Sequence, residues 1–482
     1  MLGILVVAQF MVVLDAAIVS VALPSIQRDL GFTQAELAWV INAYILVFGC
    51  FLLLGGRAAD LFGRKTVFLA GVSLFGAASL ACGLAGGSTE LVASRAIQGL
   101  GAAILSPAAL SIVTTTFTDI EGRNKALGVW GGIAGVAAAV GVLAGGLLTA
   151  AAGWRWVFFV NVPVVVALLF ASRLLPAGPR PARRPRLDLP GGALVTAGLC
   201  LGVYAIFEAP QTGWASPRTL GALVTAVVLL AGFVGWERRS AEPLVPLGVF
   251  RLPGVSGANA VNVFVGAGLF STFFFLTLYF QHVLGYGALK TGLAQLPLCV
   301  AQLVAARAAV PLAVRFGPRF PLAAALVVMA GSLLWFAQLG PHATYAVDVL
   351  APSVAFGAGL SVAVVMTFIA GQHGVPGPLA GLASGLINTT LNIGGALGLA
   401  VLGAVATART KAVLGDASLS HSLAAGYRTG WTVAAALAFT GAVLAVAALG
   451  NRPGNTRDRT DVPTPKREPI PSTATNSRSD QR

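Results

Sequence analysis

Residues 56–65 read Gly-Arg-Ala-Ala-Asp-Leu-Phe-Gly-Arg-Lys, a short polar stretch between two long apolar segments at 37–56 and 66–86. The four residues that end this stretch, Phe-Gly-Arg-Lys, are matched 254 residues later by Phe-Gly-Pro-Arg at 316–319. The second copy also lies between two apolar segments. A repeat at this spacing predicts two related halves, each built from membrane-spanning helices.

The composition of the whole chain also indicates a membrane protein. Of 482 residues, 56% are hydrophobic and 10% are charged, where a soluble domain averages about 25% charged residues. Apolar segments of roughly 20 residues, the length that a helix needs to cross the hydrocarbon core, recur along the sequence. We therefore expect an all-α polytopic membrane protein with 14 transmembrane helices. The predicted segments are 2–24, 37–56, 66–86, 91–115, 124–150, 155–175, 188–207, 218–236, 255–280, 291–314, 320–340, 346–371, 380–406 and 427–450.

The basic residues indicate how these segments are oriented. Most of the 31 Lys and Arg residues lie in every second loop, in the basic stretch 173–186 and in the tail. By the positive-inside rule, both termini are expected in the cytoplasm and the chain in the inner membrane as a multi-pass protein. The net charge of +14 then reflects topology, and no nucleic-acid partner is expected. Tryptophans near predicted helix ends fit an interfacial belt: Trp39, Trp154, Trp156, Trp214, Trp236, Trp335 and Trp431.

The loops divide the chain into four expected parts. Residues 1–175 would form an N-terminal six-helix bundle, and residues 255–450 a C-terminal one. Between them, 176–254 would contain a basic linker, two inserted helices and a following loop. Residues 451–482 are rich in Pro, Thr, Ser, Arg and Asp, a composition typical of disorder, and are expected to be a disordered cytoplasmic tail. The arrangement would be six, two and six helices.

One acid lies deep inside the first apolar segment. Asp15 is about thirteen residues from the inner end of 2–24, which is roughly 20 Å at 1.5 Å per residue. It cannot reach water there, so we expect it to face the bundle interior or a wet cavity and to exchange protons. Arg95, near the outer end of 91–115, lies at a similar depth because the two segments run in opposite directions. Asp15 and Arg95 are the predicted proton-coupling pair. The alternative for Asp15 is an acid that only serves packing through a hydrogen bond to a neighbour. The alternative for Arg95 is an arginine that reaches the outer headgroups.

The stretch 56–65 is predicted to act as a conformational latch. An acid at a helix end can accept backbone N–H bonds from a neighbouring helix and pair with a cation, and these contacts break when the two halves separate. The alternative, charges that only set orientation, leaves the acid without a role. The predicted latch residues are Gly56, Asp60, Gly63, Arg64, Lys65, Asp119 and Arg123.

The segment 124–150 contains small residues at the spacing that allows close helix approach. The predicted packing positions are Gly131, Gly135, Gly141, Gly145 and Gly146. The segment 380–406 is also rich in glycine. Packing alone would explain any single glycine, whereas two such segments would also suit surfaces that rock against each other.

Signals for catalysis or cofactor binding are weak. The sequence contains no Gly-Lys dipeptide and hence no Walker A lysine. The four histidines lie far apart and the four cysteines fall inside apolar segments, so no metal site, disulfide or cofactor is expected. A channel or membrane-embedded enzyme would need a cluster of membrane acids or a ring of pore residues. An ion gradient, and a proton gradient in particular, is the expected energy source.

Several motifs in order carry a family resemblance. Residues 14–24, which include the acid, are similar to a helix 1 signature, and 56–65 to a loop motif. Residues 95–99, Arg-Ala-Ile-Gln-Gly, resemble a helix 4 motif whose arginine is implicated in proton transfer. Residues 154–163 and 381–395 look like two further motifs. Together they resemble the major facilitator superfamily, and specifically its fourteen-helix drug:proton antiporter branch, over nearly the whole chain except the tail.

One motif departs from the pattern of that branch. Its helix 5 has a Gly-Pro pair, where this sequence has Gly141-Val142 followed by Gly145-Gly146. Without proline the helix keeps a backbone hydrogen bond and bends less. The antiport role of that motif is therefore less expected in this protein. Neither 291–314 nor 380–406 contains a carboxylate, so dicationic substrates are less expected.

The resemblance implies a proton-coupled efflux transporter that exports hydrophobic or amphipathic organic compounds, such as drugs, by alternating access. Its partners would be a small organic substrate, protons and the lipid bilayer, and it would work as a monomer. The alternative within transport is a dedicated exporter of one endogenous metabolite or antibiotic. Whether the natural start lies upstream is left open. The predicted cavity residues are polar or aromatic positions inside helices: Asn42, Tyr44, Gln98, Asn262, Phe270, Gln295, Asn388 and Asn392.

Overall fold

The computed structural model describes residues 1–116, 120–175, 188–240, 243–252, 254–375, 379–414 and 418–449. These residues are helical with connecting turns, and no strand occurs among them. Eleven of the described helices are long and apolar enough to cross a membrane. The expectation of an all-α polytopic membrane protein is therefore confirmed. The predicted tail, 451–482, and the linker 176–187 lie outside the described residues.

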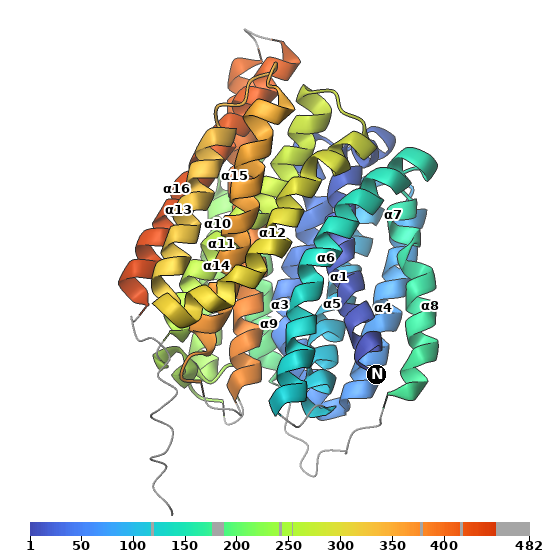
Figure 1. The fold of residues 1–482 in the computed structure, drawn as a ribbon, viewed down its shortest axis with the longest axis vertical. Coiled ribbons are helices and arrows are strands. Elements are labelled where there is room, and N and C mark those ends of the chain that lie inside the picture. Colours follow the sequence, from blue (N-terminus) through green and yellow to red (C-terminus); the bar gives the residue numbers. More distant parts are fainter. Residues whose placement is uncertain are drawn as a thin grey trace, which may run out of the picture.

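The N-terminal helices gather on one side of the molecule (Figure 1). They are α1 (Leu2–Leu30), α2 (Gln34–Leu37), α3 (Trp39–Phe62), α4 (Arg64–Leu84), α5 (Ser88–Thr116), α6 (Ile120–Ala152), α7 (Trp156–Phe159) and α8 (Asn161–Ala171). The short α2 begins at a capping box, in which Thr33 accepts from the Glu36 amide and the Glu36 carboxylate accepts from the Thr33 amide. The segment predicted at 155–175 corresponds to one candidate span, Trp156–Leu174, within which a turn at Val160 separates α7 from α8.

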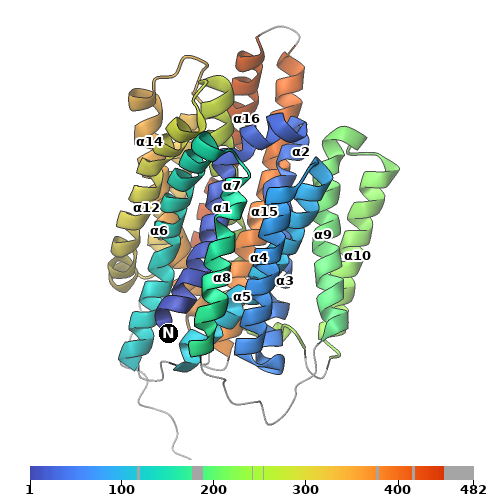
Figure 2. The same cartoon turned by 90° about the vertical axis from the view of Figure 1, so that its right-hand side faces the viewer.

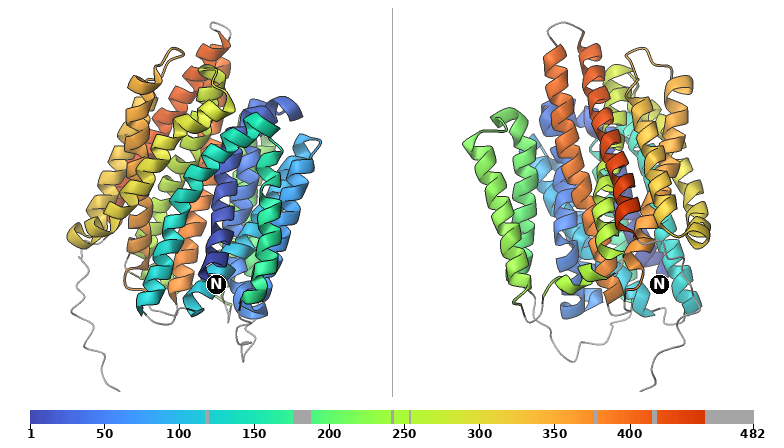
Figure 3. Two further views of the ribbon diagram at one scale, coloured as in Figure 1. Left: turned by 45° about the vertical axis from the view of Figure 1, so that its right-hand side comes forward. Right: turned by 90° about the vertical axis from the view of Figure 1, so that its left-hand side faces the viewer.

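Two further helices form a hairpin at one edge of the molecule (Figures 2 and 3). They are α9 (Leu189–Thr212) and α10 (Pro217–Glu237), and each starts with a side-chain cap followed by a proline. Helix α9 packs against α3 and α15, which come from opposite sides of the molecule, while α10 packs mainly against α9. The hairpin is therefore attached to the rest of the protein through α9.

The C-terminal helices form the other side of the molecule (Figure 1). They are α11 (Val255–Leu278), α12 (Ala288–Phe316), α13 (Arg319–Phe336), α14 (Leu350–Gln372), α15 (Ala380–Val413) and α16 (Leu419–Ala448). Wider π-helical turns extend α11 over Tyr279–Val283 and precede α14 over Tyr345–Val349. The two turns touch through the rings of Phe280 and Tyr345, 6.3 Å apart.

The two sides meet along two seams, α6 with α12 and α3 with α15. At the first seam the backbones approach closely, since a Cβ added to Gly146 would lie 2.8 Å from the carbonyl oxygen of Ala288. At the second, a Cβ on Gly49 would lie 2.9 Å from the Cβ of Asn392. Small residues at both positions allow the helices to approach this closely.

Trp431 does not belong to an interfacial belt, contrary to the prediction from its place near a helix end. Helix α16 begins at Leu419 rather than near residue 427, so this tryptophan lies well inside the helix. Its side chain is 0% exposed and packs against the rings of Phe275, Tyr279 and Phe336. It is a core residue of the C-terminal helices.

Candidate functional site

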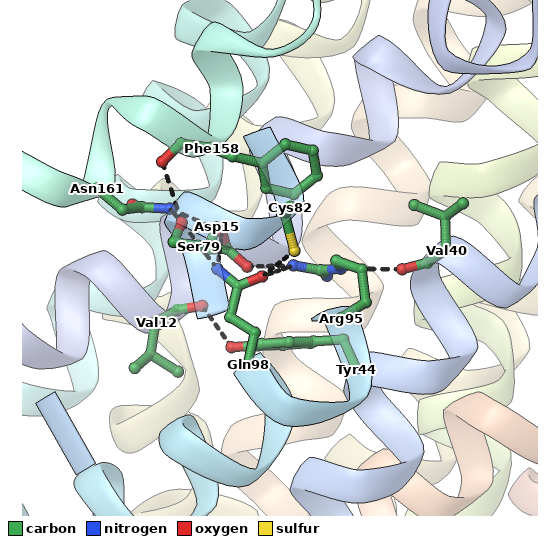
Figure 4. A network of polar contacts seen from close by, with 10 residues as sticks. All are labelled: Val12, Asp15, Val40, Tyr44, Ser79, Cys82, Arg95, Gln98, Phe158 and Asn161. Carbon is green, nitrogen blue, oxygen red and sulfur yellow. Dashed lines mark hydrogen bonds and ion pairs between the residues drawn. The ribbon is translucent and has the colours of Figure 1, made fainter. Parts of the chain in front are cut away.

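The acid and the arginine predicted to form a pair are in contact. Asp15 on α1 and Arg95 on α5 form an ion pair with 2.6 Å between Oδ2 and Nη1, and Figure 4 shows them side by side. Their side chains are 0% and 1% exposed. Breaking such a buried pair leaves an uncompensated charge, which is strongly destabilising. The two residues therefore form one electrostatic unit.

Two amide side chains complete the surroundings of the carboxylate. Gln98 Nε2, one turn after Arg95 on α5, donates to Asp15 Oδ1 at 2.8 Å. Asn161 Nδ2, at the start of α8, donates to the same oxygen at 2.8 Å. Ser79 Oγ on α4 accepts from both amides, at 3.2 and 3.0 Å, and donates to Phe158 O at 3.0 Å. Helices α1, α4, α5 and α8 thus all contribute side chains to a single network (Figure 4).

The guanidinium of Arg95 has partners besides the acid. Its Nε donates to Val40 O at 3.0 Å, and Nη1 also donates to Gln98 Oε1 at 2.7 Å. Its Cζ lies 4.2 Å from the centroid of the Tyr44 ring, a distance at which the ring face attracts a cation. The Tyr44 hydroxyl donates to Val12 O at 3.2 Å. Arg95 is therefore supported on three sides without Asp15.

The carboxylate of Asp15 and the guanidinium of Arg95 depend on each other to different degrees. Three donors surround the carboxylate, and hydrogen bonds to a charged group in a low-dielectric site are strong. The Val40 carbonyl, the Gln98 oxygen and the Tyr44 ring contact Arg95 without involving the acid. The charge attraction between α1 and α5 therefore requires Asp15, whereas the position of Arg95 does not rest on Asp15 alone.

The other predicted cavity residues do not join this network. Asn42 is buried on α3, and its amide oxygen and nitrogen have no partner among the described residues. On α15, Asn388 and Asn392 each donate to the carbonyl one turn earlier. Asn42 and Gly49 lie two turns apart on one face of α3, and Gly49 contacts Asn392. These asparagines therefore lie along the α3–α15 seam.

Three predicted cavity residues lie within the C-terminal helices. Asn262 on α11 donates to Ile387 O at 2.6 Å and accepts from Thr367 at 3.1 Å. Gln295 on α12 donates to Thr277 at 2.8 Å, while its oxygen has no partner among the described residues. The ring of Phe270 packs directly on Gly395. The structure places these three away from the Asp15 network.

The predicted latch is described only in part. Gly63 has a φ of 91° between α3 and α4, a left-handed conformation that favours glycine. Lys65 Nζ donates to Leu175 O, just after α8, at 2.6 Å. Gly56 lies on α3 facing Pro107, and Arg64 is partly buried. The side chains of Asp60 and Arg123, and residue Asp119, lie outside the described part of the structure.

Two of the predicted packing glycines touch the helix that carries the acid. A Cβ on Gly141 would lie 2.9 Å from Leu14 O, and one on Gly145 would lie 2.5 Å from Ile18 O. Gly141, Gly145 and Gly146 therefore place α6 directly against α1 and α12. The surroundings of Gly131 and Gly135 are outside the described side chains.

Sequence reasoning missed Ser79 and Asn161 as members of the site. Asn161 lies in the motif at 154–163. Its amide side chain inside an apolar segment could have indicated a buried polar contact. Ser79 carried no such signal, because a serine in an apolar helix commonly bonds its own backbone. The described residues contain no group of three metal-ligating side chains, and all four cysteines are free.

Comparison with known proteins identifies the family. The model of the Major Facilitator Superfamily matches residues 5–399. The puromycin resistance protein pur8 of Streptomyces alboniger is 41% identical over 93% of this chain and 90% of its own length. The cephamycin export protein CmcT of Amycolatopsis lactamdurans is 42% identical over 82% of each chain. The tetracenomycin C resistance and export protein of Streptomyces glaucescens is 36% identical over 93% of this chain and 82% of its own.

Solved transporter structures share the fold. A D-xylose-proton symporter aligns with a TM-score of 0.64 at 13% identity and covers 93% of this chain and 97% of its own. An auto-inhibited peptide transporter of the POT family aligns with a TM-score of 0.66 at 15% identity, covering 93% and 96%. The sequence match and the shared fold agree, and the chain belongs to the Major Facilitator Superfamily of membrane transporters.

Proposed function

We propose that this protein is a proton-coupled exporter of hydrophobic or amphipathic organic compounds, including antibiotics, and belongs to the fourteen-helix drug:proton antiporter branch. The observation that carries the proposal is the ion pair between Asp15 and Arg95, fully buried within membrane-spanning helices. An ionisable group at this depth is costly and marks an ion pathway or coupling site. Relatives named for resistance to or export of puromycin, cephamycin and tetracenomycin C support a drug-like substrate.

In the proposed cycle, Asp15 exchanges protons and the two halves alternate access around it. Protonation from the outside neutralises the pair and loosens α1 from α5, and substrate arriving from the inside favours release of the proton. The two ligands act in opposite directions because each binds one state of the same site better. The asparagines along the α3–α15 seam, with Tyr44 and Gln98, are the proposed substrate contacts.

We propose that the chain crosses the membrane fourteen times, as six, two and six helices, with both termini in the cytoplasm. Besides the eleven long spans there are three shorter apolar stretches, at Trp39–Leu52, Val136–Ala152 and Pro190–Ile206. They lie inside helices of 24, 33 and 24 residues, each long enough to cross. The hairpin α9–α10 is then the insertion between bundles 1–175 and 255–450. Asp60 remains the proposed latch acid at the inner end of α3.

The test is proton release from energised inverted membrane vesicles, scanned with lipophilic cations and neutral antibiotics. Wild-type protein should release protons with a subset of compounds, and Asp15→Asn should lose this signal because asparagine carries no exchangeable charge. Glu90→Gln, at the exposed outer end of α5, is the matched control and should retain it. Uphill export by Asp15→Asn at normal protein level would remove Asp15 from the coupling role. A signal confined to one compound would favour a dedicated exporter.

A further inference from the structure

A groove lies on the surface of the C-terminal helices, away from the Asp15 network. It has a volume of about 430 Å³, and every residue that lines it is apolar. Helix α14 packs against both α12 and α13, which have few contacts with each other, so α14 forms the floor. Ala358 and Val362 lie on the floor, and Leu312 and Val328 on the walls.

Two aromatic rings form the mouth of the groove at the turn between α12 and α13. Phe316 and Phe320 both line it and are about half exposed, at 50% and 51%. The turn between them contains Gly317, whose φ is 70°, so a short left-handed link brings the ends of the two helices together. The mouth therefore lies at one end of the two helices.

An arginine side chain lies over each of these rings. Arg315 Cζ lies 5.2 Å from the Phe316 ring centroid, and Arg319 Cζ lies 5.4 Å from that of Phe320. Among the described residues neither guanidinium has an ion-pair partner, and Arg319 Nε is buried without any hydrogen-bond partner. Two positive charges thus lie next to an apolar groove, and the Nε donor of Arg319 is left without an acceptor.

The start of α13 adds hydrogen-bond donors at the mouth. This helix begins at Arg319 and has no side-chain cap. The backbone amides of Arg319 and Phe320 therefore lie in its first turn, where such groups can donate to an anion. A negative group at this turn would lie beside these amides and both arginines.

We propose that this groove binds an anionic phospholipid, with one acyl chain between α12 and α13 and the phosphate between Arg315 and Arg319. The apolar lining suits a hydrocarbon chain, each buried CH₂ of which is favourable, and basic pockets between membrane helices bind anionic headgroups. A soluble anion would use the arginines but not the groove, and a neutral lipid would use the groove but not the arginines. The proposal takes from the proposed function only the assignment of this mouth to the cytoplasmic leaflet.

Native mass spectrometry of the purified full-length protein tests the proposal directly. Phosphatidylglycerol and phosphatidylcholine with identical acyl chains are titrated against the protein. We expect phosphatidylglycerol to bind the tighter of the two, and the double variant Arg315→Gln/Arg319→Gln to bind it about tenfold or more weakly. Ala324→Phe, which fills the groove, should also weaken binding although both arginines remain.

Two matched controls accompany these variants. Arg173→Gln removes an exposed arginine that lies over Phe170 but does not line the groove, and Val227→Phe enlarges an exposed residue of α10. Both should bind phosphatidylglycerol like the wild type. If the double variant does not fold, binding of phosphatidylglycerol is measured with Arg315→Gln alone and with Ala324→Phe. Arg315 is exposed, so its replacement should leave the fold intact.

Several results would overturn the proposal. Equal binding of the two lipids, unchanged binding by the arginine variants, or competition by soluble glycerol phosphate would each exclude a lipid site with this geometry. Displacement of the lipid by a lipophilic cation at the same groove, without any preference for phosphatidylglycerol, would assign the groove to substrate instead. Because binding is measured without transport, absence of drug export would count against the proposed function only.

Discussion

At the scale of single residues, the carboxylate of Asp15 depends on three donors from two other helices, α5 and α8. Arg95 supplies charge, while Gln98 and Asn161 supply neutral amides to the opposite oxygen. Ser79 fixes the orientation of both amides by accepting a bond from each. Loss of either amide would therefore leave this oxygen with one donor fewer.

Replacing Asn161 should slow export. Asn161→Ala removes one of the three donors to the Asp15 carboxylate, a bond of about 1.5–3 kcal/mol. Because this bond also ties α8 to α1, we expect the export rate to fall by about tenfold or more. Export rates in vesicles, compared with the wild type at equal protein level, check this outcome.

Ser106→Ala is the matched control for that experiment. Ser106 donates to Gln9 at 2.8 Å and also joins α5 to α1, but it does not touch Asp15. Its export rate should remain that of the wild type. A wild-type rate for Asn161→Ala, or an equal loss in both variants, would contradict a specific role of Asn161.

The sequence predicts a contact of this site only where both residues are charged and lie at matching depths in the membrane. Asp15 and Arg95 could be paired because charged residues are rare in apolar segments and the two depths agree. Ser79 could not be found this way, since hydroxyls are common in membrane helices and their partners depend on how the helices pack. Asn161 was likewise hidden, since its contact with Asp15 depends on how α8 packs against α1.

At the scale of elements, helix boundaries are predicted well only inside the apolar part of the sequence. Helix α16 begins eight residues before the predicted segment because residues 419–426 are more polar yet still helical. Hydropathy reports where a helix is buried in lipid and not where its hydrogen bonding starts. The same limit explains why Trp431 was assigned to an interface.

Close packing between α6 and α1 should be sensitive to one added side chain. Gly145→Val would place a Cβ 2.5 Å from Ile18 O, and overpacking of this kind costs about 1–3 kcal/mol. We expect a lower thermal unfolding temperature in detergent, measured by intrinsic fluorescence. Gly331→Val on α13, where nothing lies within 4 Å, is the control and should unfold like the wild type. Equal unfolding temperatures would show that α6 can move away from α1 at no cost.

At the scale of the whole molecule, the neighbouring Gly146 faces the other half of the protein. Its contact is with Ala288 on α12, at the end where Gln281 of the C-terminal helices also donates to Val21 O of α1 at 2.9 Å. Both contacts join the halves near the ends assigned to the outside. This structure is therefore closed on that side of the α6–α12 seam.

Gly146→Val should shift the alternation between the two states rather than the stability of either half. A side chain at this position blocks approach of α12, so the outward-open state should be more populated and export should fall. An impermeant thiol reagent added from outside should label Asn42→Cys faster in the Gly146→Val background. The comparison is with Gly331→Val in the same cysteine background. No change in labelling rate would contradict a role for this contact in closure.

The position of α9 makes the two seams unequal in what can reach them through the bilayer. Helices α9 and α10 stand beside the α3–α15 seam (Figure 2), so a molecule diffusing in the membrane plane meets this hairpin first. Along the other seam, apolar side chains of α6 and α12 are themselves exposed, as at Leu147 and Leu293. A compound dissolved in lipid thus meets the α6–α12 seam directly, whereas α9 covers the α3–α15 seam.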